Sequence, residues 1–320
     1  MTRSRLANLV GMAIGVLGIA FVVVRIVRDR TEIADALSSA NLAWLGVGGA
    51  TGLAAMALIG ANWLLILRRS NAVAPWRRGM SWFFVGQLGK YVPGGIWPVV
   101  GQAELARRGG TTRGTAYSST AMSMVATFLG AATVAAATGL IAPTDGRLLP
   151  AAITMALLAG IAILTIPSVR STLDRLTHRV TRRELRLPDT QWFIVLVLRH
   201  VPVWLFFAGM SVFSVVALGV DLDAELVIEL IFVTCISWMA GFVIVGVPGG
   251  IGVREAIFIA MTTAPLGAGV AVSAAVLSRV VSIAVDLGGA ALSVAIARTA
   301  PELLSDERAD PHTTDRYAAP

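Results

Sequence analysis

Long apolar stretches recur along this chain, and seven of them are long enough to cross a lipid bilayer. A bilayer core about 30 Å thick needs roughly 20 consecutive apolar residues in a helix. The stretches run over Leu6–Val27, Leu42–Leu67, Tyr117–Ala142, Leu148–Ile166, Trp192–Leu218, Leu226–Val247 and Ala268–Ala297. The pattern predicts an all-α polytopic membrane protein with about seven to eight transmembrane helices.

Two further apolar segments are interrupted by the same tetrapeptide, Pro-Gly-Gly-Ile. The first copy, Pro93-Gly94-Gly95-Ile96, divides the segment Ser81–Ala103, and the second, Pro248-Gly249-Gly250-Ile251, precedes the short stretch Ala256–Ala264. Proline removes a backbone donor and glycine weakens helical order, so each copy should break a helix. Matching breaks in two halves of a transporter point to its binding site. We therefore expect two re-entrant hairpins that act as gating elements.

Composition agrees with a membrane protein, and the positions of the arginines set its orientation. The chain is 56% hydrophobic and only 14% charged, with a formal net charge of +7. If the N-terminus is cytoplasmic and the first broken segment is re-entrant, the largest arginine clusters lie inside, as the positive-inside rule requires. The excess of positive charge is therefore explained by the membrane topology, and no nucleic-acid partner is expected. The same alternation makes the second motif re-entrant and places the C-terminal tail outside.

The order of spans and breaks suggests an internal two-fold repeat within one transmembrane domain, residues 1–297. Two spans, a Pro-Gly-Gly hairpin and a further span occur in residues 1–142 and again in 192–297, in the same sense, as in parallel repeats. Residues 143–191 form a linker helix and a basic loop, and the polar tail 298–320 is expected to be disordered. The alternative is that the tetrapeptide recurs by chance in a chain with 32 glycines.

Two segments have a second interpretation. Leu6–Val27 follows two arginines like a signal peptide, but it exceeds the usual apolar length, which favours a retained span. In Ser168–Pro188 the apolar residues recur every three or four positions, which predicts a helix on the anionic cytoplasmic leaflet. The alternative is an ordinary basic loop that only sets topology. The leaflet would be contacted by Arg170, Arg175, Arg182 and Arg183.

Ionisable residues within apolar segments are the candidate site, because a charge in hydrocarbon is costly and is usually functional. Guanidinium groups suit phosphate oxygens, and helix N-termini at the glycine breaks also attract anions. The candidate lipid- or phosphate-binding residues are Lys90, Arg199, Arg254 and Arg279, with Glu104, Glu255 and Asp286 balancing their charge. The structural alternative is a salt bridge from Arg279 to Asp286 or Glu255 that only locks helices. Tyr91 and Trp97 are expected to be interface anchors.

No cofactor is expected from the sequence. The single cysteine, Cys235, and the three histidines, which are far apart, do not form a metal-ligand pattern. The chain also lacks the glycine-rich Lys-Ser/Thr loop that binds nucleotides.

Two motifs together resemble a known family. They are Gly86–Gly95, followed by Ala103–Gly110, and Val247–Ala256, followed by Leu277-Ser278-Arg279. These are similar to the transmembrane, flippase-like region of bacterial lysylphosphatidylglycerol synthase, which also occurs as stand-alone membrane proteins. The resemblance implies a multi-pass protein of the inner (plasma) membrane that moves lipids between leaflets. After Ala297 only a short tail follows, so no synthase domain is expected, and the lipid could be a phospholipid or a polyprenyl-phosphate-linked sugar.

Two other function classes stay open at this stage. Asp221-Leu222-Asp223 could hold a divalent metal in a membrane glycosyltransferase that uses a lipid-linked sugar, although such residues more often cap the following helix. The small residues Gly11, Gly15 and Gly18 would suit helix association in a non-transporting assembly factor, with an unknown protein partner, but they equally suit internal packing.

Overall fold

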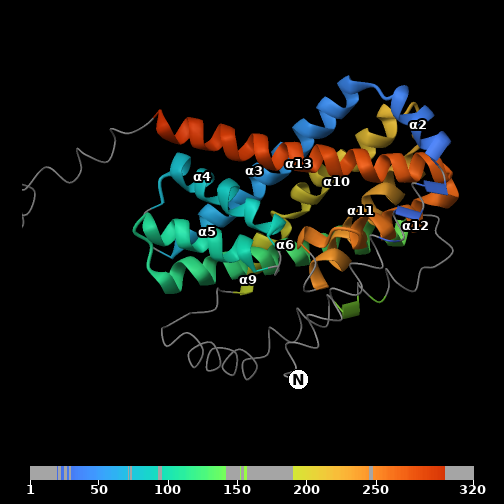
Figure 1. The fold of residues 1–320 in the computed structure, drawn as a ribbon. Coiled ribbons are helices and arrows are strands. Elements are labelled where there is room, and N and C mark those ends of the chain that lie inside the picture. Colours follow the sequence, from blue (N-terminus) through green and yellow to red (C-terminus); the bar gives the residue numbers. More distant parts are fainter. Residues whose placement is uncertain are drawn as a thin grey trace, which may run out of the picture.

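The described part of the chain is built from helices alone (Figure 1). In this computed structural model it comprises residues 30–299 without 71, 73, 93–95, 142–151, 153–154, 157–189 and 245–247, together with residues 20, 23, 24, 27 and 28. The elements are α2 (Arg30–Ser38), α3 (Leu42–Arg69), α4 (Trp76–Gln87), the 3-10 turn η1 (Leu88–Tyr91), α5 (Trp97–Arg108), α6 (Arg113–Ile141), α9 (Thr190–Leu198), α10 (Val201–Ala217), α11 (Ala224–Val243), the 3-10 turn η2 (Pro248–Gly250), α12 (Val253–Leu266) and α13 (Ala268–Arg298).

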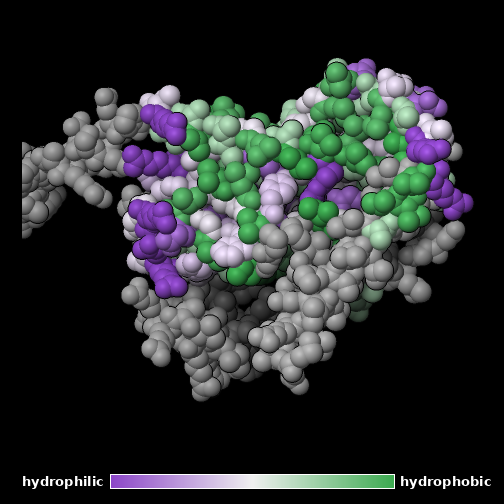
Figure 2. Space-filling view, in the orientation of Figure 1, coloured by the Kyte–Doolittle hydropathy of each residue, from purple (hydrophilic) through white to green (hydrophobic). Residues whose placement is uncertain are grey.

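Five helical segments in the described residues are long and apolar enough to cross a membrane. They are Leu42–Arg69, Arg113–Ile141, Gln191–Ala217, Ala224–Val243 and Ala268–Arg298. They confirm five of the spans expected from the sequence, and the other two, Leu6–Val27 and Leu148–Ile166, lie almost wholly outside the described residues. Figure 2 shows the matching surface, with hydrophobic residues across the middle and hydrophilic residues at the two ends. The protein is a multi-pass membrane protein.

Helix starts follow the local sequence. Asn41 precedes α3, and its side-chain oxygen accepts a hydrogen bond from the Ala43 amide at 2.9 Å. Asp223 precedes α11 in the same way and accepts from the Leu226 amide at 2.8 Å. These caps satisfy amides that have no acceptor within the helix. The expectation that Asp223 caps a helix is therefore confirmed.

Helices α3 and α10 pack antiparallel at very short range because glycines line their contact. Gly48 faces Phe213, and about one helical turn further along α3, Thr51 faces Gly209. A Cβ at Gly209 would lie 2.7 Å from the Thr51 hydroxyl oxygen, so the interface has no room for a methyl group. Such small residues let helix backbones approach closely in membranes.

The two helices on either side of the first break, α4 and α5, form a short antiparallel pair. Helices α4 and α5 have 12 residues each, which corresponds to about 18 Å at 1.5 Å per residue, too short to cross a bilayer core. They pack side by side and antiparallel, with Gly86 against Gln102 and Gly89 against Trp97. The chain therefore returns to the end from which α4 started.

The direction of α13 corrects the sequence-based topology. Gly49 and Gly52 of α3 face Val281 and Val285 of α13 in the same order along both helices, so the two helices run parallel. The end of α13 at Arg298 thus lies at the same end of the molecule as the end of α3. The tail was expected on the opposite side from the α3–α4 loop, and that prediction is wrong.

This shared end carries most of the described arginines, and we call it the basic end. Helices α3, α5 and α13 finish here, whereas α4 and α6 begin here. Its arginines are Arg68, Arg69, Arg77, Arg78, Arg107, Arg108, Arg113 and Arg298. Three of them lie over aromatic rings: Arg68 on Trp76 at 5.7 Å, Arg69 on Trp192 at 5.1 Å and Arg113 on Tyr117 at 5.7 Å.

The two long helices that follow the breaks point in opposite directions. Helix α6 runs parallel to α9 and α10, because Ala126 packs with Leu196 and Gly130 faces His200. Helix α10 is antiparallel to α3, and α13 is parallel to α3. Helices α6 and α13 are therefore antiparallel, and the same-sense repeat expected from the sequence is wrong.

Candidate functional site

The turns η1, just before the first break, and η2, at the second break, meet inside the helical bundle. Turn η1 contacts η2, and Gly249 of η2 faces both the Lys90 carbonyl oxygen of η1 and the Arg279 guanidinium of α13. A Cβ at Gly249 would lie 3.4 Å and 3.2 Å from those two atoms, and its φ of 57° is unfavourable for other residues. Glycine is thus required for this contact. The first motif itself, Pro93, Gly94 and Gly95, lies outside the described residues.

One carboxylate of α13 holds the first break. The Lys90 ammonium lies 2.7 Å from Asp286 Oδ2, and the Asp286 side chain is only 1% exposed. The Tyr91 hydroxyl donates a hydrogen bond to the same oxygen. A buried carboxylate needs such partners, because burying an unpaired charge is costly. Tyr91 is therefore part of the buried cluster, not the interface anchor that the sequence predicted.

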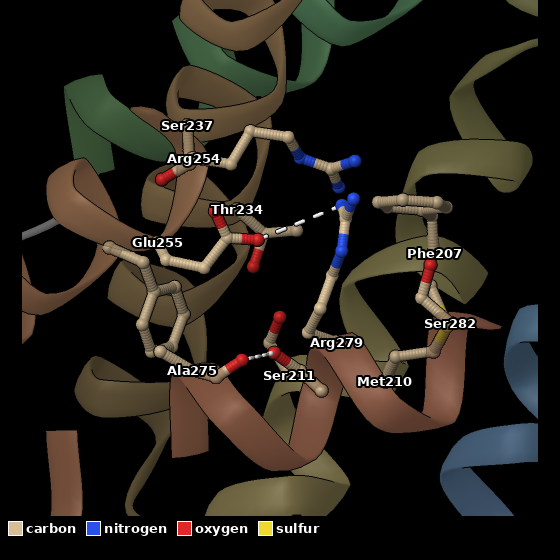
Figure 3. Close-up of a pocket in the computed structure, with 12 residues that line it drawn as sticks. Phe207, Met210, Ser211, Thr234, Ser237, Arg254, Glu255, Ala275, Arg279 and Ser282 are labelled. Carbon is tan, nitrogen blue, oxygen red and sulfur yellow. Dashed lines mark hydrogen bonds and ion pairs between the residues drawn. The ribbon is translucent and has the colours of Figure 1, made fainter. Parts of the chain in front are cut away.

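A second ion pair links α13 to the other break. Arg279 Nη1 lies 3.6 Å from Glu255 Oε1 of α12, and both side chains are largely buried (Figure 3). The other oxygen of Glu255 accepts the Gly252 amide at 2.7 Å, which caps α12. The salt bridge proposed as the structural alternative is thus present between Arg279 and Glu255. Asp286, by contrast, pairs with Lys90.

Of the three cations at this junction, Arg254 is the one that no described carboxylate pairs with. Its guanidinium lies over the Phe207 ring at 5.6 Å, and its stem crosses Gly241, where a Cβ would overlap it. Figure 3 shows the Arg254 and Arg279 guanidinium groups side by side. Three cations, including Lys90, therefore face two carboxylates, and the cluster has one positive charge in excess.

Hydroxyl groups complete the walls of a small cavity beside the two arginines. The cavity has about 40 Å³ of accessible volume, which is enough for a few water molecules and too small for a phospholipid headgroup. The Thr234 hydroxyl is buried and has no hydrogen-bond partner in the described protein. The other hydroxyl-bearing residues of the lining are Ser211, Ser237, Ser278 and Ser282.

Sequence reasoning missed these wall residues. Serine and threonine are common in membrane helices, and their spacing carries no signal of a shared cavity. Tyr91 could have been found from its position next to Lys90. Phe207 could not have been found, because its contact with Arg254 depends on how α10 packs against α12.

Two predicted site residues lie elsewhere. Arg199 is at the junction of α9 and α10, where its Nε donates to the Asn62 side-chain oxygen at 3.1 Å. Glu104 was expected to balance the binding cations, but it pairs with Arg107 at 2.7 Å and Arg108 at 3.4 Å at the basic end. Hydrogen bonding to Arg107 lowers the pKa of Glu104 to about 2, so it is ionised at neutral pH. Its proximity in sequence to the first break did not bring it into the cluster.

The remaining predictions concern the arginines of the leaflet helix and the possibility of a metal site. Arg170, Arg175, Arg182 and Arg183 of the expected leaflet helix lie outside the described residues. Within the described ranges, no three histidine, cysteine, aspartate or glutamate side chains are grouped so that they could hold a metal ion.

Residues 8–288 match the family model described as the lysylphosphatidylglycerol synthase TM region, which covers most of the chain and both breaks. No curated protein matches the sequence.

Proposed function

The chain belongs to the lysylphosphatidylglycerol synthase TM region family, and from that premise we propose that it is a lipid flippase. It moves an anionic or phosphate-bearing lipid, a phospholipid or a polyprenyl-phosphate-linked lipid, between the leaflets of the inner membrane. The headgroup of the lipid passes the junction of the two breaks while the lipid tails stay in the bilayer. The basic end faces the cytoplasm under the positive-inside rule.

The excess positive charge at this junction carries the proposal. Lys90 and Arg279 each have a carboxylate partner, whereas Arg254 has none among the described residues. A cation at membrane depth is costly unless an anion or water accompanies it. One phosphate diester would neutralise the cluster, and paired guanidinium groups match its oxygens. The unpartnered Thr234 hydroxyl supplies one further hydrogen-bond donor.

An inverted repeat would explain how such a site reaches both leaflets. We pair α3, α4, α5 and α6 with α10, α11, α12 and α13. Contacts within the first set recur in the second: α3–α4 with α10–α11, α4–α5 with α11–α12, α5–α6 with α12–α13, and α3–α6 with α10–α13. Because α6 and α13 run in opposite directions, the axis of such a repeat would lie in the membrane plane. Inverted repeats commonly alternate access to a midplane site.

The small cavity fits a closed state in this cycle. Helix α13 is tied to the first break through Asp286 and to the second through Arg279. Opening toward either leaflet requires one of these ties to loosen, because the cavity is too small for a headgroup. An entering phosphate would compete with Glu255 for Arg279. The ion pairs thus serve as gates whose bonds the substrate replaces.

The test is lipid translocation by the full chain in proteoliposomes. Labelled lipids with anionic and zwitterionic headgroups are compared for the wild type, Arg254→Gln and Arg279→Gln, and Arg78→Gln serves as a control with the same charge change at the basic end. We expect both cluster variants to lose translocation of the anionic lipid while Arg78→Gln keeps it. Equal rates for all four proteins would overturn the proposal.

A further inference from the structure

The cavity beside Arg254 and Arg279 is too small for a lipid headgroup, yet it borders the excess positive charge of the junction. It has about 40 Å³ of accessible volume and is lined by residues of α10, α11, α12 and α13. A lipid phosphate therefore cannot neutralise Arg254 while the cavity is closed, and no described carboxylate pairs with Arg254. Another group must accompany this charge, because an unpaired cation at membrane depth is costly.

Three hydroxyl groups of the lining have no hydrogen-bond partner in the described protein, and each belongs to a different helix. Thr234 of α11 is 5% exposed, and its hydroxyl oxygen is buried and unpaired. Ser211 of α10 and Ser282 of α13 are also buried and make no hydrogen bond there. Figure 3 shows all three around the Arg279 side chain. Buried polar groups are nearly always paired, so these hydroxyls call for a partner inside the cavity.

The two other serines of the lining are satisfied within their own helices. They donate to backbone carbonyl oxygens at 2.7 Å and 3.0 Å. The unpaired state of Thr234, Ser211 and Ser282 is therefore not shared by every hydroxyl of this cavity.

Glu255 also lines the cavity, but protein groups already use both of its oxygens. One oxygen faces Arg279 Nη1 at 3.6 Å, and the other accepts the Gly252 amide at 2.7 Å. Arg279 Nη1 donates to the Gly249 carbonyl as well, which leaves Nη2 and Nε for another acceptor. Glu229 of α11 does not line the cavity, since it lies five positions before Thr234, about 7.5 Å along the helix.

The missing partner has to be small, negatively charged and able to accept several hydrogen bonds. Water would satisfy the hydroxyls, but it would leave the charge of Arg254 unbalanced. A phosphate diester would balance the charge, but its substituents need more room than the cavity has. A chloride ion is close to a water molecule in size, carries one negative charge and accepts from any direction, so donors on separate helices can share it.

We propose that the closed cavity binds one chloride ion, held by Arg254, Arg279 and the Thr234 hydroxyl, and that the phosphate of the entering lipid displaces this ion. The displacement rests on the proposed flippase function, whereas the chloride site does not. Exchanging one anion for another keeps the charge of the junction balanced throughout the cycle. Chloride and the anionic lipid therefore compete for the same two arginines.

The first experiment measures chloride binding by the purified full chain and does not depend on translocation. Radiolabelled chloride is titrated in a gluconate buffer of constant ionic strength, because gluconate is too large for the cavity. The variants are Arg254→Gln and Thr234→Val. Their controls are Arg78→Gln, which removes a charge at the basic end, and Thr234→Ser, which keeps the hydroxyl. Thermal melting of each protein in chloride and in gluconate reports the same binding through stability.

We expect saturable binding by the wild type and by both controls, and a melting temperature that is higher in chloride than in gluconate. Thr234→Val should bind about tenfold more weakly, as for the loss of one hydrogen bond to a charged group. Arg254→Gln should lose saturable binding, because the excess charge is gone. No saturable binding by the wild type, or equal binding by the wild type and both variants, would overturn the chloride site.

The second experiment tests displacement in proteoliposomes of the wild type and Arg78→Gln. Replacing gluconate by chloride at constant ionic strength should slow translocation of the labelled anionic lipid by both proteins. Saturable chloride binding with equal translocation rates in the two buffers would refute displacement. Saturable chloride binding without any lipid translocation would instead refute the flippase function and leave the chloride site in place.

Discussion

Replacing Asp286 with asparagine removes the negative charge that holds the first break against α13. Lys90 then keeps its charge beside a neutral amide, while Tyr91 keeps an acceptor. Removing one partner of a buried ion pair usually costs about 3–5 kcal/mol. The Lys90 side chain is 24% exposed and can partly recover hydration, so we expect the low end, about 3 kcal/mol. At about 2 °C per kcal/mol for a chain of this size, melting should fall by roughly 6 °C.

The assay is thermal melting of the purified full chain for four proteins: wild type, Asp286→Asn, Lys90→Met and the double variant. Both single variants should melt below wild type, because each leaves one charge buried without its partner. The double variant should recover most of the loss, since it removes both charges together. Losses that simply add in the double variant would show that Lys90 and Asp286 do not interact, and the buried tie would be refuted.

Three further substitutions test the packing. Gly289→Ala should destabilise the protein by about 1–3 kcal/mol in thermal melting, because its Cβ would lie 2.5 Å from the Phe84 ring. The neighbouring substitution Gly288→Ala, at a position with open space around it, should be neutral or slightly stabilising. Equal effects of the two substitutions would contradict the α4–α13 contact. Gly249→Ala should cost about 1–2 kcal/mol from its positive φ and slow translocation, and unchanged melting would contradict the turn. Trp204→Phe should cost about 1 kcal/mol by losing the indole hydrogen bond to the Thr127 carbonyl, and wild-type melting of this variant would contradict that bond.

The helices and their class could be predicted from the sequence because the signal is local. Long apolar runs are sufficient to identify spans, and five of them recur in the structure with ends shifted by a few residues. The breaks were also predictable, since proline and paired glycines act on the backbone where they stand. The meeting of Lys90, Arg254 and Arg279 followed from one further idea, that both breaks form the same site.

The relative directions of the helices could not be predicted in the same way. The expected repeat counted spans and assumed that the second break mirrored the first on the same side. The relation of α13 to α3 depends on contacts such as Gly52 with Val285, more than two hundred positions apart in sequence. The prediction that Glu104 balances the binding cations was wrong for the same reason. Glu104 is close in sequence to the first break, but α5 carries it back to the basic end, where Arg107 is one helical turn away.

The glycine-lined contact between α3 and α10 restricts which parts of the protein can move. Backbones this close, with Gly209 directly on Thr51, would collide if either helix slid by a fraction of a turn. The contact also lies between the two sets of helices that we relate by inversion. In the proposed transport cycle, α3 and α10 would thus stay fixed relative to each other. Helices α4 and α5 would move against them as one pair, and α11 and α12 as the other.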